Sequence, residues 1–326
     1  MIAATPNNLH EKWMRRCIEL AQCGQTHAAP NPMVGAVIVH QDRIIGEGYH
    51  IRCGEAHAEV NAINSVSPAD RPLLRDSTLY VSLEPCAHFG RTPPCARLIV
   101  RTGIPRVVVG CIDPFAKVQG RGISIMREAG IDVTVGVCEQ ECLELNRRFI
   151  TFQTKGRPYI TLKWAESSDG YIDRLRDGGR PALLSTPRTL MHVHQLRAEH
   201  TAILVGHRTL QVDHPQLNIR HWVGSNPVKI VLGHVSEGEL PPGFEAYADI
   251  RTLLQELHSR GLQSLLVEGG SLTLQSFIDN ELWDEAWVEH AQTRLEAGVP
   301  APLIAESKHH TDVMLYDVRH THYFNY

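Results

Sequence analysis

Short β-branched runs alternate with amphipathic segments along most of the chain, and this pattern restricts the fold more than any other feature. The apolar positions of residues 9–24 recur at helical spacing and predict a leading helix. Alternating strands and helices then indicate a layered α/β domain with a largely parallel sheet. The strands are predicted at residues 33–39 and 44–50, which read as a hairpin, and at residues 78–83, 106–112 and 131–137, with helices at residues 57–66, 94–103 and 122–130.

A second series of the same kind begins after residue 157. Strands are predicted at residues 158–165, 201–206, 228–233 and 264–270, with helices at residues 186–199, 250–261 and 272–280. The chain has 326 residues, whereas a single domain usually has about 100 to 200. We therefore expect two α/β domains, at residues 1–150 and 151–326. One barrel-like domain is the alternative.

The composition indicates a folded, soluble protein. Hydrophobic residues make up 43% of the chain and charged residues 21%, which is close to ordinary globular domains. The formal charge of −4 offers no basic surface to a nucleic acid, so we expect no such partner. No apolar run approaches the roughly 20 residues that span a bilayer, and no signal peptide is evident. We expect a cytoplasmic protein without a membrane partner, and also a homo-oligomer, either a dimer or a tetramer.

The cysteines are distributed unevenly along the chain. All eight lie at or before Cys142, and the rest of the chain has none. Disulfides are rare in a cytoplasmic protein of this size, so metal ligands or small core residues are the favoured interpretations. Five of the cysteines are interpreted as apolar filler: Cys17, Cys23, Cys111, Cys138 and Cys142.

Two short motifs carry the chemistry of the first half. His57 and Glu59 begin a predicted helix in "HAEV", and Cys86 and Cys95 bracket the loop that follows the strand "TLYVSL". Their order matches the zinc deaminase signature H-x-E…P-C-x-x-C, except that eight residues rather than two separate the cysteines.

One imidazole and two thiolates would leave the fourth tetrahedral position of Zn²⁺ open for a water molecule. Glu59 lies two residues from a ligand and is of the type that moves protons, so it is the expected general acid and base. Cys53 offers a second interpretation. As a fourth ligand it would close the shell and make the site structural.

Several strings, the two motifs among them, resemble the bifunctional riboflavin-biosynthesis deaminase/reductase family. They are "PNPMVGAVIV", "GYH", "HAEV" and "LEPCAHFGRTPPC" in the first half, and "LKWAESSDGYI", "AILVGHRTLQVDHPQLNIR" and "LLVEGGSLTLQSF" in the second. In that family the loop between the two cysteine ligands is long, as it is here. The resemblance implies an N-terminal cytidine-deaminase-like three-layer domain and a C-terminal dihydrofolate-reductase-like α/β domain.

The resemblance also implies substrate, cofactors and site residues for the deaminase half. The substrate would be the small molecule 2,5-diamino-6-(5-phosphoribosylamino)pyrimidin-4(3H)-one, with Zn²⁺ held by His57, Cys86 and Cys95, and Glu59 transferring protons. Four further positions match the pyrimidine and phosphate pocket of the family: Asn31, His50, His88 and Arg91.

The reductase half would use NADPH to reduce the ribosyl side chain of 5-amino-6-(5-phosphoribosylamino)uracil to ribityl. No G-x-G-x-x-G motif follows a predicted strand, but the paired glycines at a helix start could bring backbone N–H groups to a phosphate. The positions that match cofactor contacts are Glu166, Thr209, Asp213, Gly270, Ser271, Leu272, Thr273, Leu274, Gln275 and Ser276. Those that match substrate contacts are Arg197, Leu217, Arg220 and Glu268. Asp213 is also a candidate proton donor.

The chain departs from the family pattern in the reductase half. Many relatives have a Trp-Ile-Thr string where this chain has Leu183 at the aromatic position, and Pro181 stands where a polar contact is expected. Glu166 replaces a smaller residue beside the cofactor, and His214 replaces a second acid. These departures leave open a deaminase whose reductase half does not turn over. A separate alternative, from another substrate class, is a nucleoside or RNA-base zinc deaminase with a non-catalytic C-terminal domain.

Overall fold

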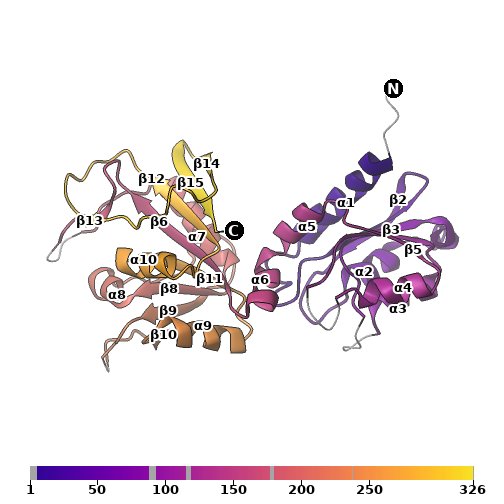
Figure 1. Ribbon diagram of the computed structural model, residues 1–326, viewed down its shortest axis with the longest axis horizontal. Coiled ribbons are helices and arrows are strands. Elements are labelled where there is room, and N and C mark those ends of the chain that lie inside the picture. The colour runs from indigo at the N-terminus through magenta and orange to yellow at the C-terminus, as the bar shows by residue number, and fades with distance from the viewer. Residues whose placement is uncertain (1–5, 88–92, 115–118, 177–179, 237, 326) are drawn as a thin grey trace. The chain divides into compact units, whose positions relative to one another are not determined.

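The computed structural model describes residues 6–87, 93–114, 119–176, 180–236 and 238–325 (Figure 1). The chain separates into two compact units, Met1–Lys155 and Gly156–Tyr326. No helix in the described ranges is both long enough and apolar enough to cross a membrane. Two candidate residues of the sequence analysis, His88 and Arg91, lie outside the described residues.

The first unit is built on one five-stranded sheet with the order β2-β1-β3-β4-β5. Its strands are β1 (Gly35–His40), β2 (Arg43–Tyr49), β3 (Thr78–Leu83), β4 (Arg106–Cys111) and β5 (Asp132–Val135). Its helices are α1 (Pro6–Gln22), α2 (Ala58–Ser65), α3 (Cys95–Thr102), α4 (Arg121–Glu128), α5 (Glu139–Leu145) and α6 (Arg147–Lys155), with a 3₁₀ turn, η1, at Arg71–Asp76.

This sheet is mixed, which corrects the prediction of a largely parallel sheet. β3, β4 and β5 are parallel, but β1 is antiparallel to both β2 and β3. The predicted hairpin is confirmed, and its two loop residues, Gln41 and Asp42, have φ values of 47° and 62°. Positive φ at both central residues is the geometry of the tight turn that matches strand twist, although Gln41 gives no glycine or asparagine signal for it.

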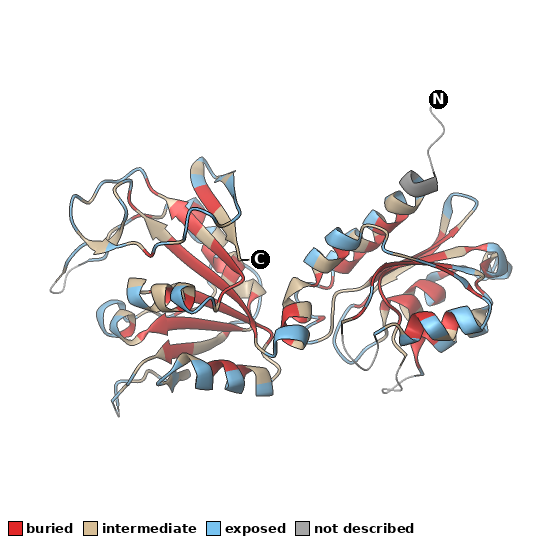
Figure 2. Ribbon diagram, in the orientation of Figure 1, coloured by how far each residue is buried: buried red, intermediate tan, exposed pale blue. Residues whose placement is uncertain are grey.

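Helices cover both faces of the first sheet and form a three-layer unit. Alternate residues of β1 separate the two cores, because Ala36 and Ile38 pack with α2, α3 and α4, whereas Val37 and Val39 pack with α1 and α5. Figure 2 shows the resulting buried strands in red between partly exposed helices. Period-two alternation of apolar residues on both faces is what a sheet buried on both sides requires.

The second unit contains an eight-stranded sheet with the order β10-β9-β8-β11-β6-β12-β15-β14. Its strands are β6 (Tyr159–Glu166), β8 (Ala202–Gly206), β9 (Val228–Leu232), β10 (Phe244–Tyr247), β11 (Ser264–Gly269), β12 (Glu285–His290), β14 (His310–Leu315) and β15 (Val318–Phe324), and β7 (Tyr171–Asp173) pairs with β13 (Val299–Pro300) in a separate two-stranded sheet. Its helices are α7 (Pro187–Glu199), α8 (His207–Asp213), α9 (Ile250–Ser259) and α10 (Ser271–Asp279). In sheet order, the six strands β10, β9, β8, β11, β6 and β12 are parallel. β15 and β14 run antiparallel at one edge.

The two faces of the second sheet carry different helices. The larger core packs α9 and α10 against one face, through residues such as Leu253, Leu274 and Phe277. A smaller cluster packs Leu196 of α7 against Leu266 on the other face. α7 begins with a capping box at Thr186, whose side chain accepts from the Thr189 backbone N–H, and its first helical residue is proline. The parallel strands all end at the same edge of the sheet, and a layer of helices lies on each face.

The core of the second unit provides a stability test. Leu204 is fully buried in it, whereas the side chain of Leu303 is 78% exposed. Leu204→Ala should lower the free energy of unfolding of this unit by about 2–5 kcal/mol, because the lost methyl groups leave a cavity. Leu303→Ala, the matched control, should change it by less than about 0.5 kcal/mol. Urea denaturation followed by tryptophan fluorescence would measure both, since four of the five tryptophans lie after residue 155.

Candidate metal centre and reductase site

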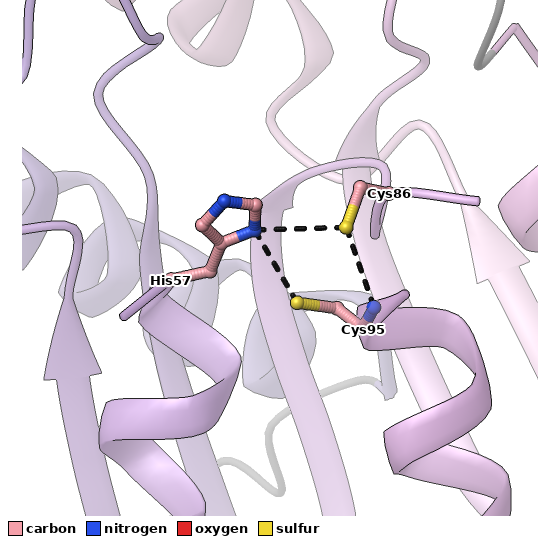
Figure 3. A group of neighbouring side chains, drawn as sticks. All are labelled: His57, Cys86 and Cys95. Carbon is pink, nitrogen blue, oxygen red and sulfur yellow. Dashed lines mark hydrogen bonds between the residues drawn. The ribbon is translucent and has the colours of Figure 1, made fainter. Parts of the chain in front are cut away.

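Three candidate metal ligands from separate segments come together in the first unit (Figure 3). His57 is the residue before α2, Cys86 follows β3, and Cys95 is the first residue of α3. Their ligand atoms all lie within 4.8 Å of one another. His57 Nδ1 is 3.6 Å from the Cys86 sulfur and 3.4 Å from the Cys95 sulfur, and the Cys95 backbone N–H donates to the Cys86 sulfur.

These distances fit a tetrahedral zinc ion. Bonds of about 2.0 Å to nitrogen and 2.3 Å to sulfur place a tetrahedral N and S about 3.5 Å apart. A set of one imidazole and two thiolates is also typical of zinc rather than of magnesium or calcium. The group has three members among the described residues. Cys53 is exposed and is not part of it, so the closed shell with Cys53 as fourth ligand is not supported.

Glu59 lies beside these ligands in the first turn of α2 and is only 3% exposed. Burial of the carboxyl group raises the pKa of Glu59 to about 7, and the negative charge of Cys86 acts in the same direction. The Cys86 thiol itself has its pKa lowered, chiefly by its hydrogen bond with Cys95. A carboxyl group with a pKa near neutrality can both accept and release a proton at physiological pH.

A second carboxylate, Glu84, holds the loop that carries Cys86. Glu84 is 4% exposed, and its oxygens accept backbone N–H groups of Gly120 and Gly122, each at 2.9 Å, at the start of α4. Negative charge at the first turn of a helix is favourable, because the N–H groups there have no partners within the helix. Gly122 has no space for a side chain, since a Cβ there would lie 2.0 Å from the Pro85 carbonyl oxygen. The hydrogen bonds of Glu84 and the close approach of Gly122 to Pro85 fix the position of the residue before Cys86.

Two of the predicted pocket residues, Asn31 and His50, lie next to the candidate metal centre. The His50 ring packs edge-on against His57, with ring centroids 5.4 Å apart. His50 Nδ1 lies 3.1 Å from the Ala56 carbonyl oxygen and therefore donates to it, so Nε2 accepts from the Asn31 amide at 3.0 Å. Burial lowers the pKa of His50, which favours this neutral form. Asn31 and His50 thus form an ordered polar edge beside His57.

In the second unit, the predicted cofactor segment lies at the carboxyl ends of β8 and β11. Gly269 has a φ of 146°, which favours glycine, and the next residue precedes α10. A Cβ at Gly206 would lie 2.3 Å from the Thr273 hydroxyl, so α10 approaches β8 closely. None of the described side chains caps α10, which leaves its first N–H groups available to a phosphate. The side chain of Leu274 is fully buried, so only its backbone could contact a ligand, whereas Leu272 is 86% exposed.

Two predicted substrate residues, Arg197 and Glu268, bind each other. The Arg197 guanidinium donates two hydrogen bonds to the Glu268 carboxylate, at 2.7 and 2.6 Å, and a third to the Asn218 carbonyl oxygen at 3.0 Å. Leu217 is 2% exposed, so its side chain belongs to the core rather than to the surface of a site. The Arg220 side chain lies on the surface and donates to Gln216.

Two further predicted cofactor residues in this unit, Asp213 and Glu166, are also paired. Asp213 at the end of α8 accepts from Arg176, which also binds Asp173. Glu166, the last residue of β6, lies 3.1 Å from His290. Thr209 lies against Gly270, because a Cβ on that glycine would be 3.1 Å from its hydroxyl.

The positions that depart from the family pattern are now placed. Leu183 is 86% exposed, and Pro181 is exposed in a segment without regular structure. His214 ends α8 with a φ of 43°.

Sequence reasoning missed a buried polar group on the face that α7 covers. Glu289 is fully buried and accepts from Ser185 at 2.8 Å and Thr189 at 2.7 Å, with the Lys163 ammonium 3.7 Å away. An acidic residue within the strand-like string "EAWVEH" is the signal that could have identified it.

The chain is similar to known proteins in both halves. A family model described as the cytidine and deoxycytidylate deaminase zinc-binding region matches residues 7–111, and one described as the RibD C-terminal domain matches residues 158–292. The riboflavin biosynthesis protein RibD of Aquifex aeolicus is 37% identical over 308 residues, which cover 85% of each chain. That of Escherichia coli K12 is 41% identical over 325 residues, covering 90% of this chain and 86% of its own. The chain belongs to the RibD family.

Solved structures agree with this membership. Acinetobacter baumannii RibD superposes with a TM-score of 0.87 at 30% identity, covering 99% of this chain and all of its own. A deaminase/reductase from Thermotoga maritima superposes with a TM-score of 0.86 at 34% identity and the same coverage. RibD proteins are bifunctional enzymes of riboflavin biosynthesis, with a zinc-binding deaminase domain and an NADPH-dependent reductase domain. The predicted family, fold class and pair of activities are confirmed, and the RNA-base or nucleoside deaminase is not favoured.

The candidate metal centre yields a test based on metal content. Cys95→Ser should weaken zinc binding by at least about 10- to 100-fold, because a poor ligand atom replaces one of the three ligand atoms. Loss of a residue that only hydrogen bonds to a ligand already costs that much. Cys53→Ser is the matched control and should retain the wild-type zinc content, since Cys53 is exposed and outside the group. Metal analysis after dialysis would measure both. Full zinc occupancy in Cys95→Ser would contradict the ligand assignment.

Proposed function

We propose that residues 1–150 hydrolytically deaminate 2,5-diamino-6-(5-phosphoribosylamino)pyrimidin-4(3H)-one. Residues 151–326 would then reduce the ribosyl side chain of 5-amino-6-(5-phosphoribosylamino)uracil to ribityl. The observation that carries the first step is the group His57, Cys86 and Cys95 beside a buried Glu59. The Thermotoga maritima neighbour, described as a diaminohydroxyphosphoribosylaminopyrimidine deaminase and 5-amino-6-(5-phosphoribosylamino)uracil reductase, supports this pair of substrates.

The deamination depends on proton transfer at Glu59. Zinc, when bound by His57 and the two cysteines, supplies Lewis-acid activation of a water molecule. The Glu59 carboxylate takes one proton from the attacking water and delivers it to the ring nitrogen. It then takes the second proton from the added hydroxyl group and delivers it to the amine, which leaves as ammonia. The water oxygen replaces the exocyclic nitrogen on the ring carbon, so the product is a uracil.

Substrate binding in this half is assigned to the polar edge of the candidate metal centre. Asn31 has a fixed orientation because its amide donates to His50, which leaves the amide oxygen directed for a donor on the pyrimidine. His88 and Arg91 complete the proposal as contacts of the pyrimidine and the phosphate. Their role rests on the family resemblance of the loop "AHFGRTPPC".

The reductase proposal assigns the cofactor and the sugar phosphate to different faces of the second sheet. NADPH, when bound, supplies a hydride to C1 of the ring-opened sugar imine. The backbone of Gly270–Ser276 would hold its phosphates at the start of α10, with Thr209, Asp213 and Glu166 as further contacts. Arg197 and Arg220 would bind the substrate phosphate, since guanidinium groups bind phosphate in a forked geometry. Glu268 would orient Arg197, and the backbone of Leu217 would contact the sugar.

Assembly and compartment complete the proposal. All eight cysteines are free in the structure, which is typical of proteins in a reducing compartment and supports a cytoplasmic location. We propose a homo-oligomer, a dimer or a tetramer, which light scattering of the purified chain would measure.

The role of Glu59 predicts a separation of metal binding from turnover. Glu59→Gln keeps the size of the side chain but cannot accept the proton, so deamination should fall by about 10²- to 10⁴-fold. Zinc content should remain at the wild-type level, because Glu59 is not a ligand. Ammonia release and metal analysis would be measured on the same preparation. Near-normal turnover would remove Glu59 from its proposed role.

The role of Arg197 predicts a loss confined to one activity. Arg197→Ala removes a charge-assisted contact to the phosphate worth about 1.5–3 kcal/mol, so kcat/KM for reduction should fall by about 10- to 100-fold. Ammonia release from the diaminopyrimidine should be unchanged, because that reaction belongs to the first unit. NADPH oxidation followed by absorbance, with ammonia as the control, would measure both. Equal losses in the two activities would contradict the assignment.

A further inference from the structure

A chain of four polar side chains ends at the predicted cofactor contact Glu166. His290 Nδ1 lies 3.1 Å from one Glu166 oxygen, and the Trp164 indole donates to the other at 3.0 Å. On its far side, His290 Nε2 lies 2.8 Å from the Thr321 hydroxyl, which in turn donates to Asp312 at 2.7 Å. This row of contacting side chains therefore runs from Glu166 on β6 through β12 and β15 to β14.

The contacts of His290 place it between two oxygen acceptors. The single hydroxyl hydrogen of Thr321 is used by Asp312, so Thr321 accepts from His290 Nε2. The Glu166 carboxylate is held by Trp164 on one oxygen and lies 3.1 Å from His290 Nδ1 with the other. A carboxylate accepts only, so a hydrogen on Nδ1, and with it a positive charge on the ring, would make this contact an ion pair.

Glu166 and His290 lie on the face of the sheet that α10 covers. Glu166 lies opposite His290 in the ladder, and Trp164, two residues earlier, belongs to the same core cluster as Leu274 and Phe277 of α10. The carboxyl end of β6 is adjacent to β11, whose last residue leads into α10. The Glu166 and His290 side chains are 20% and 19% exposed, so a ligand can reach them. They share one face and one edge with the segment Gly270–Ser276.

The substrate candidates lie on the opposite face. Glu268 on β11 pairs with Arg197 of α7, whereas the adjacent Val267 belongs to the cluster on the α10 side. Alternate residues of a strand point to opposite faces, so Glu166 is on the cofactor side rather than the substrate side. This placement argues against His290 as the proton donor for the sugar.

We propose that His290 is a positioning residue for NADPH, which holds the Glu166 carboxylate and cancels its charge at the cofactor site. This inference rests on the proposed reductase function. NADPH is a polyanion, and an uncompensated carboxylate beside it would repel its phosphates. Like charges brought together at an interface are strongly unfavourable. In a chain with glutamate at this position, a cation beside the carboxylate would therefore favour NADPH binding.

The other charged groups near Glu166 and His290 are of both signs. Arg319 lies opposite His290 in the ladder and is positive, but its guanidinium lies 3.9 Å from Asp312 and both groups are more than half exposed. Tyr323 and His310 face the same side from β15 and β14. His290 is the basic side chain in direct contact with Glu166 among the described residues.

The experiment compares NADPH affinity in variants of the full-length, zinc-loaded enzyme. His290→Gln keeps hydrogen-bonding groups without the charge and should raise the Kd of NADPH by at least about tenfold. This deficit should shrink between about 0.05 and 0.5 M salt, because screening weakens charge repulsion but not a packing defect. His290→Arg, which keeps the charge, should remain closer to the wild type. The double variant Glu166→Gln/His290→Gln should recover most of the lost affinity. NADPH fluorescence would give each Kd, and ammonia release would report intact folding of the first unit.

The outcomes separate this inference from the proposed function. An unchanged Kd in His290→Gln, or a deficit that persists in the double variant or at high salt, would overturn the role of His290 while leaving the reductase intact. A wild-type chain that neither binds NADPH nor reduces the deaminated product would overturn both. If His290→Gln does not fold, the double variant and His290→Arg still test the charge. In that case a double variant whose Kd for NADPH stays about tenfold or more above that of the wild type would count against the proposal.

Discussion

The convergence of one nitrogen and two sulfurs on a common point is the constraint on which the first unit depends. His57 and Cys95 stand at the starts of two helices, and Cys86 stands after the strand between them. His57 is remote from the two cysteines along the chain, so the strand and helices between them bring the three atoms together. The Cys86 carbonyl oxygen accepts the Ala96 N–H, which binds the two cysteine segments to each other. The site is preorganised by backbone contacts rather than by the ion alone.

Much of this arrangement could be predicted from the sequence, because its signals are local. The ligand types, their order and the acid two residues from His57 fall in two short strings. Most strands of both sheets were also predictable, since buried parallel strands are apolar on both faces. The antiparallel β1–β2 pair was predictable as a hairpin too, although the first residue of its turn is Gln41 rather than glycine or asparagine.

What the sequence could not predict involves pairs of polar residues far apart along the chain. β12, β14 and β15 were not expected, because Glu285 and His322 interrupt the apolar pattern while hydrogen bonding to each other across the sheet. Likewise, a lone His290 carries no signal, and its meaning depends on Glu166, which is remote in sequence. Pairing that satisfies buried charge is a property of the folded chain, and single positions do not reveal it. The reductase contacts are the clearest case, since Asp213 and Glu166 each have a partner outside the motifs.

The uneven distribution of the thiols has a consequence for how the enzyme fails. All cysteines, including both that face His57, belong to the unit assigned to deamination, and the unit assigned to reduction has none. Thiolates are the sulfur species that oxidants attack. Under oxidative stress such a cell would retain the reduction but would lack its substrate. The deamination alone would then limit the supply of the vitamin precursor.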